Sequence, residues 1–251
     1  MASSTANQNP SFAAPALTLC PNSRAAVHCD QCRVRSLSLC GALEPDELTA
    51  LDRLSRPLSL AARETIFEQD GLAASVFNIT AGSARLYRLL PDGRRQIVGF
   101  ALPGDFLGLA MTERNAFSAD ALTPLTACQF SRHAFSDFLD QKPHLLRKLH
   151  AMASHELSLA QEQMVILGRR TAEEKVAAFL IGLRKRWARL STASVTIPLP
   201  MTRQDIGDFL GLTVETVSRM LTRLAREKAI LIVPDGVRLL DVKRIEAMAE
   251  S

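Results

Sequence analysis

Apolar residues follow several different spacings along this chain, and each spacing predicts a different element. In PDELTALDRL, Pro45 to Leu54, leucines recur at every third residue and acidic residues occupy the first turn, which predicts a short helix. From Leu58 to Phe130, short runs of β-type residues alternate with Asp-Gly and Ala-Gly turn signals at intervals of about ten residues. This alternation predicts a small antiparallel β-roll or barrel.

Between Ser131 and Leu167 the apolar spacing becomes helical. Steps of three and four residues define a narrow seam, made of Leu146, Leu149, Ala153, Leu157, Ala160, Met164 and Leu167. A narrow seam over roughly six turns is typical of a helix that pairs with a second copy of itself. The same stripe could instead pack on the β-roll of its own chain, as in an ordinary amphipathic helix.

Two helical patterns meet at a glycine in MTRQDIGDFLGLTVETVSRMLTRLAREKAI, Met201 to Ile230. Thr202 and Thr213 stand where each helix requires an N-cap. Gly207 provides a small residue where the helices cross, and Gly211 can adopt the positive φ that the turn needs. The segment predicts a helix-turn-helix, and AILIVPDGVRLL after it predicts a β-hairpin wing.

The second helix of this pair has one apolar face and one polar face. The residues expected to face outward are Val214, Glu215, Ser218, Arg219 and Thr222. Arginine can donate two hydrogen bonds to guanine, glutamate can accept one from cytosine, and serine can do either. Basic residues that could bind phosphates flank this face, namely Arg203, Arg223, Arg226 and Lys228. The helix therefore predicts a reader of double-stranded DNA, and a helical pair used only for packing is the alternative.

Composition narrows the classes of protein that fit these patterns. The chain has 251 residues, 47% of them hydrophobic, and a net charge of +4, which permits binding to a polyanion. Its apolar runs are shorter than the ~18 residues that span a bilayer, and its start lacks the features of a secretory signal. We therefore expect a cytoplasmic protein with no membrane segment. The sequence also contains no nucleophile–base pair, phosphate loop or carboxylate pair, so we do not expect an enzyme.

The patterns predict four consecutive parts. Residues 1–27 are rich in Ala, Ser, Asn and Pro without periodicity, so we expect a disordered tail. A cysteine cluster and a β-roll should occupy residues 28–140, and a dimerisation helix residues 141–168. Residues 169–251 should form a winged helix-turn-helix domain that binds DNA.

Five cysteines are the other chemically distinctive feature. Cys29 and Cys32 form a CxxC motif, Cys40 follows, and Cys20 and Cys128 lie further away. An odd number of thiols in a chain without an export signal fits poorly with a disulfide framework. The CxxC motif alone leaves zinc binding and redox sensing open, with His28 as one possible further zinc ligand. The remaining histidines show no ligand spacing and are expected to be structural or surface residues, namely His133, His144, His150 and His155.

The segments FEQDG, PGDFLGL, GRRTAEEKVAAFL and LGLTVETVSRML resemble the Crp–Fnr superfamily of bacterial transcription regulators, and its Fnr-type oxygen sensors in particular. The resemblance extends from about Cys29 to Met248, and Glu215, Ser218 and Arg219 match the Fnr pattern Glu-x-x-Ser-Arg. It implies an α+β fold with an N-terminal antiparallel β-roll like a cyclic-nucleotide-binding domain, a long dimerisation helix and a C-terminal winged helix-turn-helix. It also implies a homodimer that binds palindromes of TTGAT half-sites and contacts RNA polymerase.

The resemblance also bears on which signal is sensed. Members that bind cyclic nucleotides carry a Gly-Glu turn and then an Arg-Ser or Arg-Thr pair, whereas this chain has Asp105 for the glutamate and Ser118-Ala119-Asp120 in place of the pair. A carboxylate there would repel a phosphate, so we do not expect a cyclic nucleotide.

The cysteines match the Fnr type better. The resemblance implies a [4Fe–4S] cluster bound by Cys29, Cys32 and Cys40, in a C-x2-C-x7-C spacing, and by Cys128 as the distant ligand. Cys20 would then be dispensable. The implied function is an oxygen-responsive regulator that activates or represses genes of low-oxygen growth. A regulator of the same fold that senses thiol redox state, zinc or a small ligand remains open, as does a ligand-binding module with a degenerate DNA domain.

Overall fold

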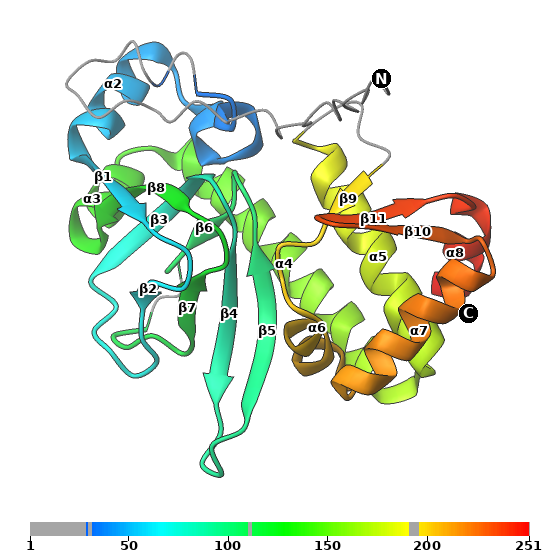
Figure 1. Ribbon diagram of the computed structural model, residues 1–251. Helices are drawn as coiled ribbons and strands as arrows, with labels where there is room; N and C mark the ends of the chain where they lie inside the picture. The colour runs from blue at the N-terminus through cyan, green and yellow to red at the C-terminus, as the bar shows by residue number, and fades with distance from the viewer. Residues whose placement is uncertain (1–28, 30–31, 110–111, 191–195, 251) are drawn as a thin grey trace, which may run out of the picture.

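The computed structural model shows a β-roll and a C-terminal helical domain, with the long helix α4, Pro143–Arg169, running between them (Figure 1). It describes residue 29 and residues 32–109, 112–190 and 196–250. The predicted tail over residues 1–27, including Cys20, lies outside the described residues. No helix in the described ranges has the length and apolar character needed to cross a membrane.

The β-roll consists of two four-stranded antiparallel sheets, with strand orders β1-β8-β3-β6 and β2-β7-β4-β5. Its strands are β1 (Ser55–Leu60), β2 (Thr65–Phe67), β3 (Ser75–Ala81), β4 (Ala84–Leu89), β5 (Arg95–Ala101), β6 (Phe106–Leu107), β7 (Ser118–Ala121) and β8 (Leu125–Ser131). Ile79, Ala119 and Leu125 lie in the core that the sheets share. The antiparallel roll predicted from the turn spacing is therefore confirmed.

Short helices cover one end of the roll (Figure 1). They are the 3-10 helices η1 (Arg35–Leu37) and η2 (Leu39–Ala42), and the α-helices α2 (Pro45–Leu54) and α3 (Arg132–Asp140). The helix predicted over Pro45 to Leu54 has these bounds, and a capping box between Glu44 and Glu47 fixes its start. Leu39 of η2, Leu48 and Leu51 of α2 and Leu145 of α4 share one buried cluster, so the cysteine-containing segment packs on the long helix.

Most of the α4 seam does not pack on its own roll. Leu149 is half-buried against the cluster at the roll's end, whereas Leu157 is 60% exposed and Met164 is 64% exposed. Other faces of α4 make the internal contacts, through the buried Leu145 and through Gln163, which donates a hydrogen bond to the Phe209 carbonyl at 3.1 Å. Among the described residues of the seam, Leu149 therefore packs on its own roll, and Leu167 lies beside Gly211 of the helix-turn-helix.

The C-terminal domain has the predicted helix-turn-helix and wing. Its elements are α5 (Ala172–Ala188), β9 (Thr196–Pro198), α6 (Arg203–Leu210), α7 (Val214–Arg226), β10 (Ile230–Val233), β11 (Gly236–Leu239) and α8 (Val242–Glu250). The side chains of Thr202 and Thr213 accept hydrogen bonds from backbone N–H groups at the starts of α6 and α7, so both predicted N-caps are present. Gly211 ends α6 with φ +64°, as the turn requires.

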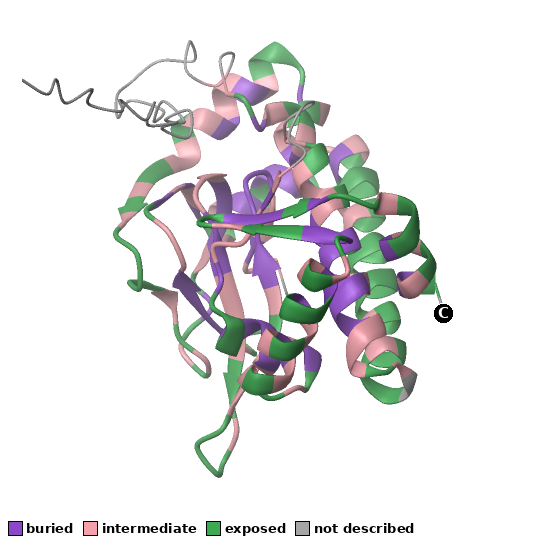
Figure 2. Cartoon of the chain, turned by 45° about the vertical axis from the view of Figure 1, so that its right-hand side comes forward, coloured by how far each residue is buried: buried purple, intermediate pink, exposed green. Residues whose placement is uncertain are grey.

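The two domains share a hydrophobic core. Ile97 and Phe100 of β5 lie in the same buried cluster as Leu180 of α5 and Leu210 of α6. The centroids of the Phe100 and Phe209 rings lie 5.3 Å apart. Buried residues form the zone where the strands meet the C-terminal helices (Figure 2), so the helix-turn-helix is docked on the roll.

Replacing Gly207 by alanine should lower the stability of the helix-turn-helix. A Cβ atom at Gly207 would lie 2.6 Å from the Leu212 carbonyl oxygen, so the two helices would have to separate. We expect a loss of about 1–3 kcal/mol, measured as a lower midpoint in thermal unfolding. Gly182→Ala is the matched control, because a Cβ there meets nothing within 4 Å and alanine favours the helix. Equal midpoints for both variants would contradict the close crossing.

Candidate DNA interface and cysteine site

Helix α7 presents its polar face outward. Glu215, Arg219 and Thr222 are exposed, Val214 and Ser218 are intermediate, and Val217, Leu221 and Leu224 are buried on the opposite side. Arg203, at the start of α6, is also exposed. All six residues predicted to contact DNA are therefore exposed or partly exposed, and the domain core packs behind α7.

The start of α7 favours an ionised Glu215. Hydrogen bonds from its own backbone N–H and from the Thr213 side chain hold the pKa of this exposed carboxyl below its usual value. A carboxylate can only accept hydrogen bonds, which suits the amino group of cytosine.

Arg223 differs from the other flanking basic residues, because carboxylates already bind it. Its guanidinium lies 3.0 Å from Glu173 and 2.9 Å from Glu227. It therefore joins α7 to the neighbouring segments, and a phosphate would have to displace these carboxylates. The sequence could not show the Glu173 contact because fifty residues separate the two positions.

The four described cysteines come from the N-terminal segment and from β8, and Cys29, Cys40 and Cys128 pack on the buried cluster at one end of the roll. The Cys32 backbone N–H donates to the Cys29 carbonyl at 3.3 Å, and Cys40 lies in η2. Cys29 lies near Cys40 and Cys128, and Cys40 lies near Cys32. All four are half-buried cysteines.

Asn78 lies between two of these cysteines. It is 2% exposed, donates from Nδ2 to the Cys40 Sγ at 3.9 Å, and is the cross-strand partner of Cys128 in the β3–β8 pair. Its Oδ1 is buried without a hydrogen-bond partner in the described structure. Our sequence reading missed this residue, although a polar amide inside the apolar strand SVFNITA is a detectable signal.

Local chemistry favours the protonated thiols. Burial raises the pKa of Cys29, and a hydrogen bond from its Sγ to Asp52 Oδ1 at 3.1 Å raises the pKa further. Burial also raises the pKa of Cys40, and this outweighs the opposing hydrogen bond involving Ser38. Binding iron would therefore require release of thiol protons.

Asp120, predicted to stand where the cyclic-nucleotide-binding members carry their basic pair, is buried and ion-paired. Its Oδ2 lies 3.0 Å from Arg85, and its Oδ1 accepts a hydrogen bond from the Tyr87 hydroxyl at 3.3 Å. Asp105, which replaces the glutamate of the turn, pairs with Arg186 of α5. Both carboxylates thus form ion pairs with arginines of the same chain.

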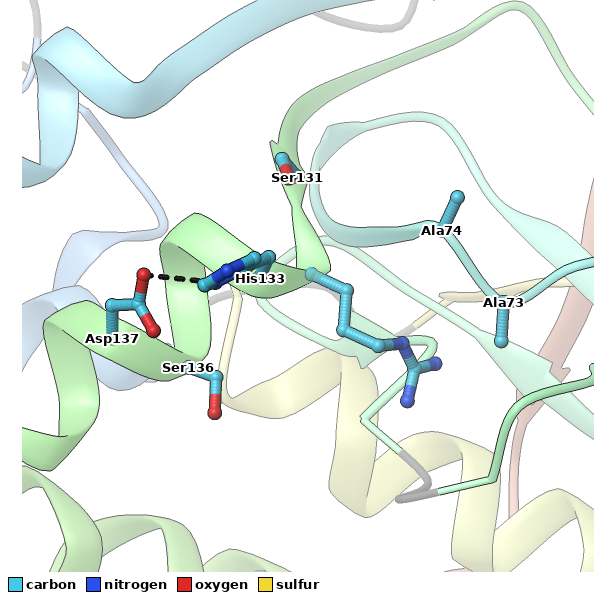
Figure 3. A pocket seen from close by; sticks show the side chains of 7 residues that line it. Ala73, Ala74, Ser131, His133, Ser136 and Asp137 are labelled. Carbon is cyan, nitrogen blue, oxygen red and sulfur yellow. Dashed lines mark ion pairs between the residues drawn. The ribbon is translucent and has the colours of Figure 1, made fainter.

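A shallow hollow lies at the start of α3 (Figure 3), and neither a cysteine nor a residue of α7 lines it. It is lined by Ala73, Ala74, Ser131, Arg132, His133, Ser136 and Asp137. His133 and Asp137 form an exposed ion pair at 2.8 Å, one helical turn apart. This matches the prediction that His133 is a surface residue.

Comparison with known proteins agrees with the fold. The cyclic nucleotide-binding domain model matches residues 57–142, and the model of bacterial regulatory proteins of the crp family matches residues 199–230. The chain is 53% identical to the transcriptional activatory protein AadR of Rhodopseudomonas palustris, over 92% of this chain and 96% of that protein. It is 51% identical to the nitrogen fixation regulation protein FixK of Bradyrhizobium diazoefficiens, over 88% and 93%.

A solved structure of a related regulator has the same fold. The structure of FixK2 from Bradyrhizobium japonicum is 35% identical, has a TM-score of 0.72 and covers 77% of this chain and 96% of its own. These relatives are regulators and not enzymes, as expected for this chain. The chain combines a helix-turn-helix with a roll like a cyclic-nucleotide-binding domain, and it shares more than half of its aligned residues with AadR and with FixK of Bradyrhizobium diazoefficiens. It therefore belongs to the Crp–Fnr superfamily of transcription regulators, in its Fnr type.

Proposed function

We propose that this DNA-binding regulator responds to oxygen through a [4Fe–4S] cluster bound by Cys29, Cys32, Cys40 and Cys128. The cluster would promote dimerisation and binding to palindromes of TTGAT half-sites when oxygen is low, and so activate or repress genes of low-oxygen growth. The observation that carries this proposal is that thiols from the N-terminal segment and from β8 lie together at the end of the roll, against α4.

The donor set fits a cluster better than a single ion. A [4Fe–4S] cluster needs one thiolate for each iron, and the described residues include four half-buried cysteines. Among the described residues, no group of three or more cysteine, histidine or acidic side chains is arranged to hold a metal ion, so the cysteines would have to move closer together to bind either a cluster or zinc. Buried thiols of raised pKa are also poor redox nucleophiles, which disfavours a simple thiol switch.

Packing connects the cysteine site to α4. Cys29, Cys40 and Cys128 contact the buried cluster that contains Leu39 of η2 and Leu145 of α4. When bound, the [4Fe–4S] group would supply an oxygen-labile link between the N-terminal segment and β8. The chain's own residues would carry this effect to the dimer helix, because a fixed η2 holds the first turns of α4 in one position.

The exposed seam of α4 supports a homodimer. Leu146, Leu157 and Met164 are 41%, 60% and 64% exposed, and a second copy of the helix would bury them. A dimer presents two α7 helices to the two halves of a palindrome, whereas a monomer reads only one half. A modest gain in dimer stability therefore becomes a large gain in occupancy of the site.

The relatives support gene activation. AadR is a transcriptional activatory protein, and the FnrL protein of Cereibacter sphaeroides, 36% identical over 85% of this chain, is a transcriptional activator. We propose that this protein likewise activates transcription through contacts with RNA polymerase.

Purification without oxygen tests the cluster. The wild-type protein should contain about four iron and four sulfide per chain, with a visible absorption that air removes. Specific binding to a TTGAT palindrome, measured against competitor DNA over a salt series, should fall on exposure to air. Stoichiometric zinc without sulfide would establish the zinc alternative, and metal-free protein with unchanged DNA binding would contradict both.

A further inference from the structure

A chain of charged side chains crosses from the β-roll to the first helix of the helix-turn-helix. Arg85 of β4 and Arg95 of β5 approach the same oxygen of Asp205 in α6, at 3.0 Å and 2.8 Å. Arg95 also lies 2.8 Å from Asp208, one turn further along α6. Arg85 continues into the roll, where it pairs with Asp120.

Asp205 uses its two oxygens for two different tasks. Oδ2 accepts from the backbone N–H and the hydroxyl of Thr202, at 2.9 Å and 2.7 Å, and so closes the capping box of α6. Oδ1 accepts from Arg85 and Arg95 of the other domain. Burial by itself raises the pKa of Asp205, but these hydrogen bonds and the two positive charges hold the pKa below its usual value.

The surroundings make this contact rigid. The Asp205 side chain is 1% exposed and that of Arg95 is 23% exposed. Gln96 donates to the Asp208 carbonyl at 2.5 Å, and the Phe209 ring packs on Phe100. Removing one partner of a buried pair leaves a charge without compensation, so α6 has a strong preference for this position.

The docked position leaves the DNA-reading face free. Glu215, Arg219 and Thr222 are exposed in this arrangement, and none of them takes part in the contacts of Asp205. The charged contact therefore does not block DNA. It fixes α6, which fixes α7 through their shared core.

We propose that Arg85, Arg95 and Asp205 are positioning residues for DNA recognition, through which the β-roll sets the angle of α7. This role rests on the proposed dimer, because two recognition helices must meet half-sites about one helical turn apart, ~34 Å. If α6 were released, each helix-turn-helix could still read one half-site. The second subunit would then bind the second half-site more weakly, because its α7 would no longer be held at the required position.

The test is the ratio of affinities for a palindrome and for a single half-site. The palindrome would be selected from random DNA with wild-type protein, and the dimeric state of each variant would be measured alongside. Arg95→Gln should lower the palindrome affinity on the order of tenfold relative to the half-site affinity. Its slope of log affinity against log salt should stay unchanged, whereas loss of a phosphate contact would reduce the slope by about one.

The neighbouring residue provides a matched control. Arg94 is 78% exposed and pairs only locally with Asp92 in the described structure, at 2.6 Å, so Arg94→Gln removes the same charge without touching α6. Arg94→Gln should keep the wild-type affinity ratio. Equal ratios in the two variants, or a reduced salt slope in Arg95→Gln, would overturn the proposal.

A conservative variant guards against misfolding. Arg95→Lys keeps the charge but loses the paired contacts to Asp205 and Asp208, and should give an intermediate ratio. A purely structural defect would lower both affinities together and leave their ratio unchanged, which would also overturn the proposal. The oligomeric state of the wild-type protein on its selected DNA is measured first. A monomer there would refute the proposed dimer itself, independently of any result from the variants.

Discussion

Replacing Cys40 by serine will remove the proposed cluster, and specific DNA binding with it. A serine hydroxyl stays protonated near neutral pH and does not replace a thiolate on iron, and Cys40 is held in η2 against Asn78 and the α4 cluster. Without the cluster, specific affinity should fall toward the non-specific level, by a factor of about 10³ or more. Iron and sulfide per chain and anaerobic DNA binding measure the effect.

Cys20→Ser is the control for Cys40→Ser. Cys20 lies outside the cysteine group that we propose as ligands, so this variant should keep its iron, its sulfide and its DNA binding. If Cys20→Ser lost the cluster while Cys40→Ser kept it, the assignment of the close-spaced ligands would be wrong. Full iron content in both variants would require a ligand other than Cys40.

Replacing Leu157 by glutamate will give a monomer that no longer binds a palindrome, even without oxygen. Leu157 is 60% exposed near the middle of the α4 seam, so a dimer would bring two carboxylates together in an apolar contact. We expect palindrome affinity to fall by about 100-fold or more, because linking two readers raises affinity by factors of 10²–10⁴. Analytical ultracentrifugation gives the oligomeric state, and iron analysis shows whether the cluster is retained.

His155→Glu tests whether position on the helix decides this outcome. His155 is exposed and lies two residues from Leu157, about 200° around the helix and away from the seam. The same charge there should leave the dimer intact. A monomer in both variants would show that charge on α4, and not the seam, controls assembly.

Features with local causes were predictable. The helix over Pro45 to Leu54, the caps at Thr202 and Thr213, and the turn at Gly211 depend on a few neighbouring residues, and each is present in the structure. The outward face of α7 followed from helical spacing alone. These are the parts of the fold in which each residue's local preference agrees with the final structure.

Features formed by long-range packing were not predictable in the same way. Strand β7, with the sequence SADA, has little intrinsic β preference and forms because β2 and β4 lie on either side of it. The position of Asn78 beside Cys40 depends on how η2 packs on the roll.

The sequence by itself determined the class of this protein: the helix-turn-helix, the roll and the family resemblance all come from local spacing and residue type. Only the tertiary structure decided that the α4 seam is largely exposed, that Cys29, Cys40 and Cys128 pack on one buried cluster with α4, and that Arg85 meets Asp205 across 120 residues. The physical reason is that the residues next to a charged side chain or a thiol in the sequence do not specify which distant residue it will contact. The partner is set when the shared hydrophobic core docks the domains, and burial then makes each ion pair strongly dependent on that docking.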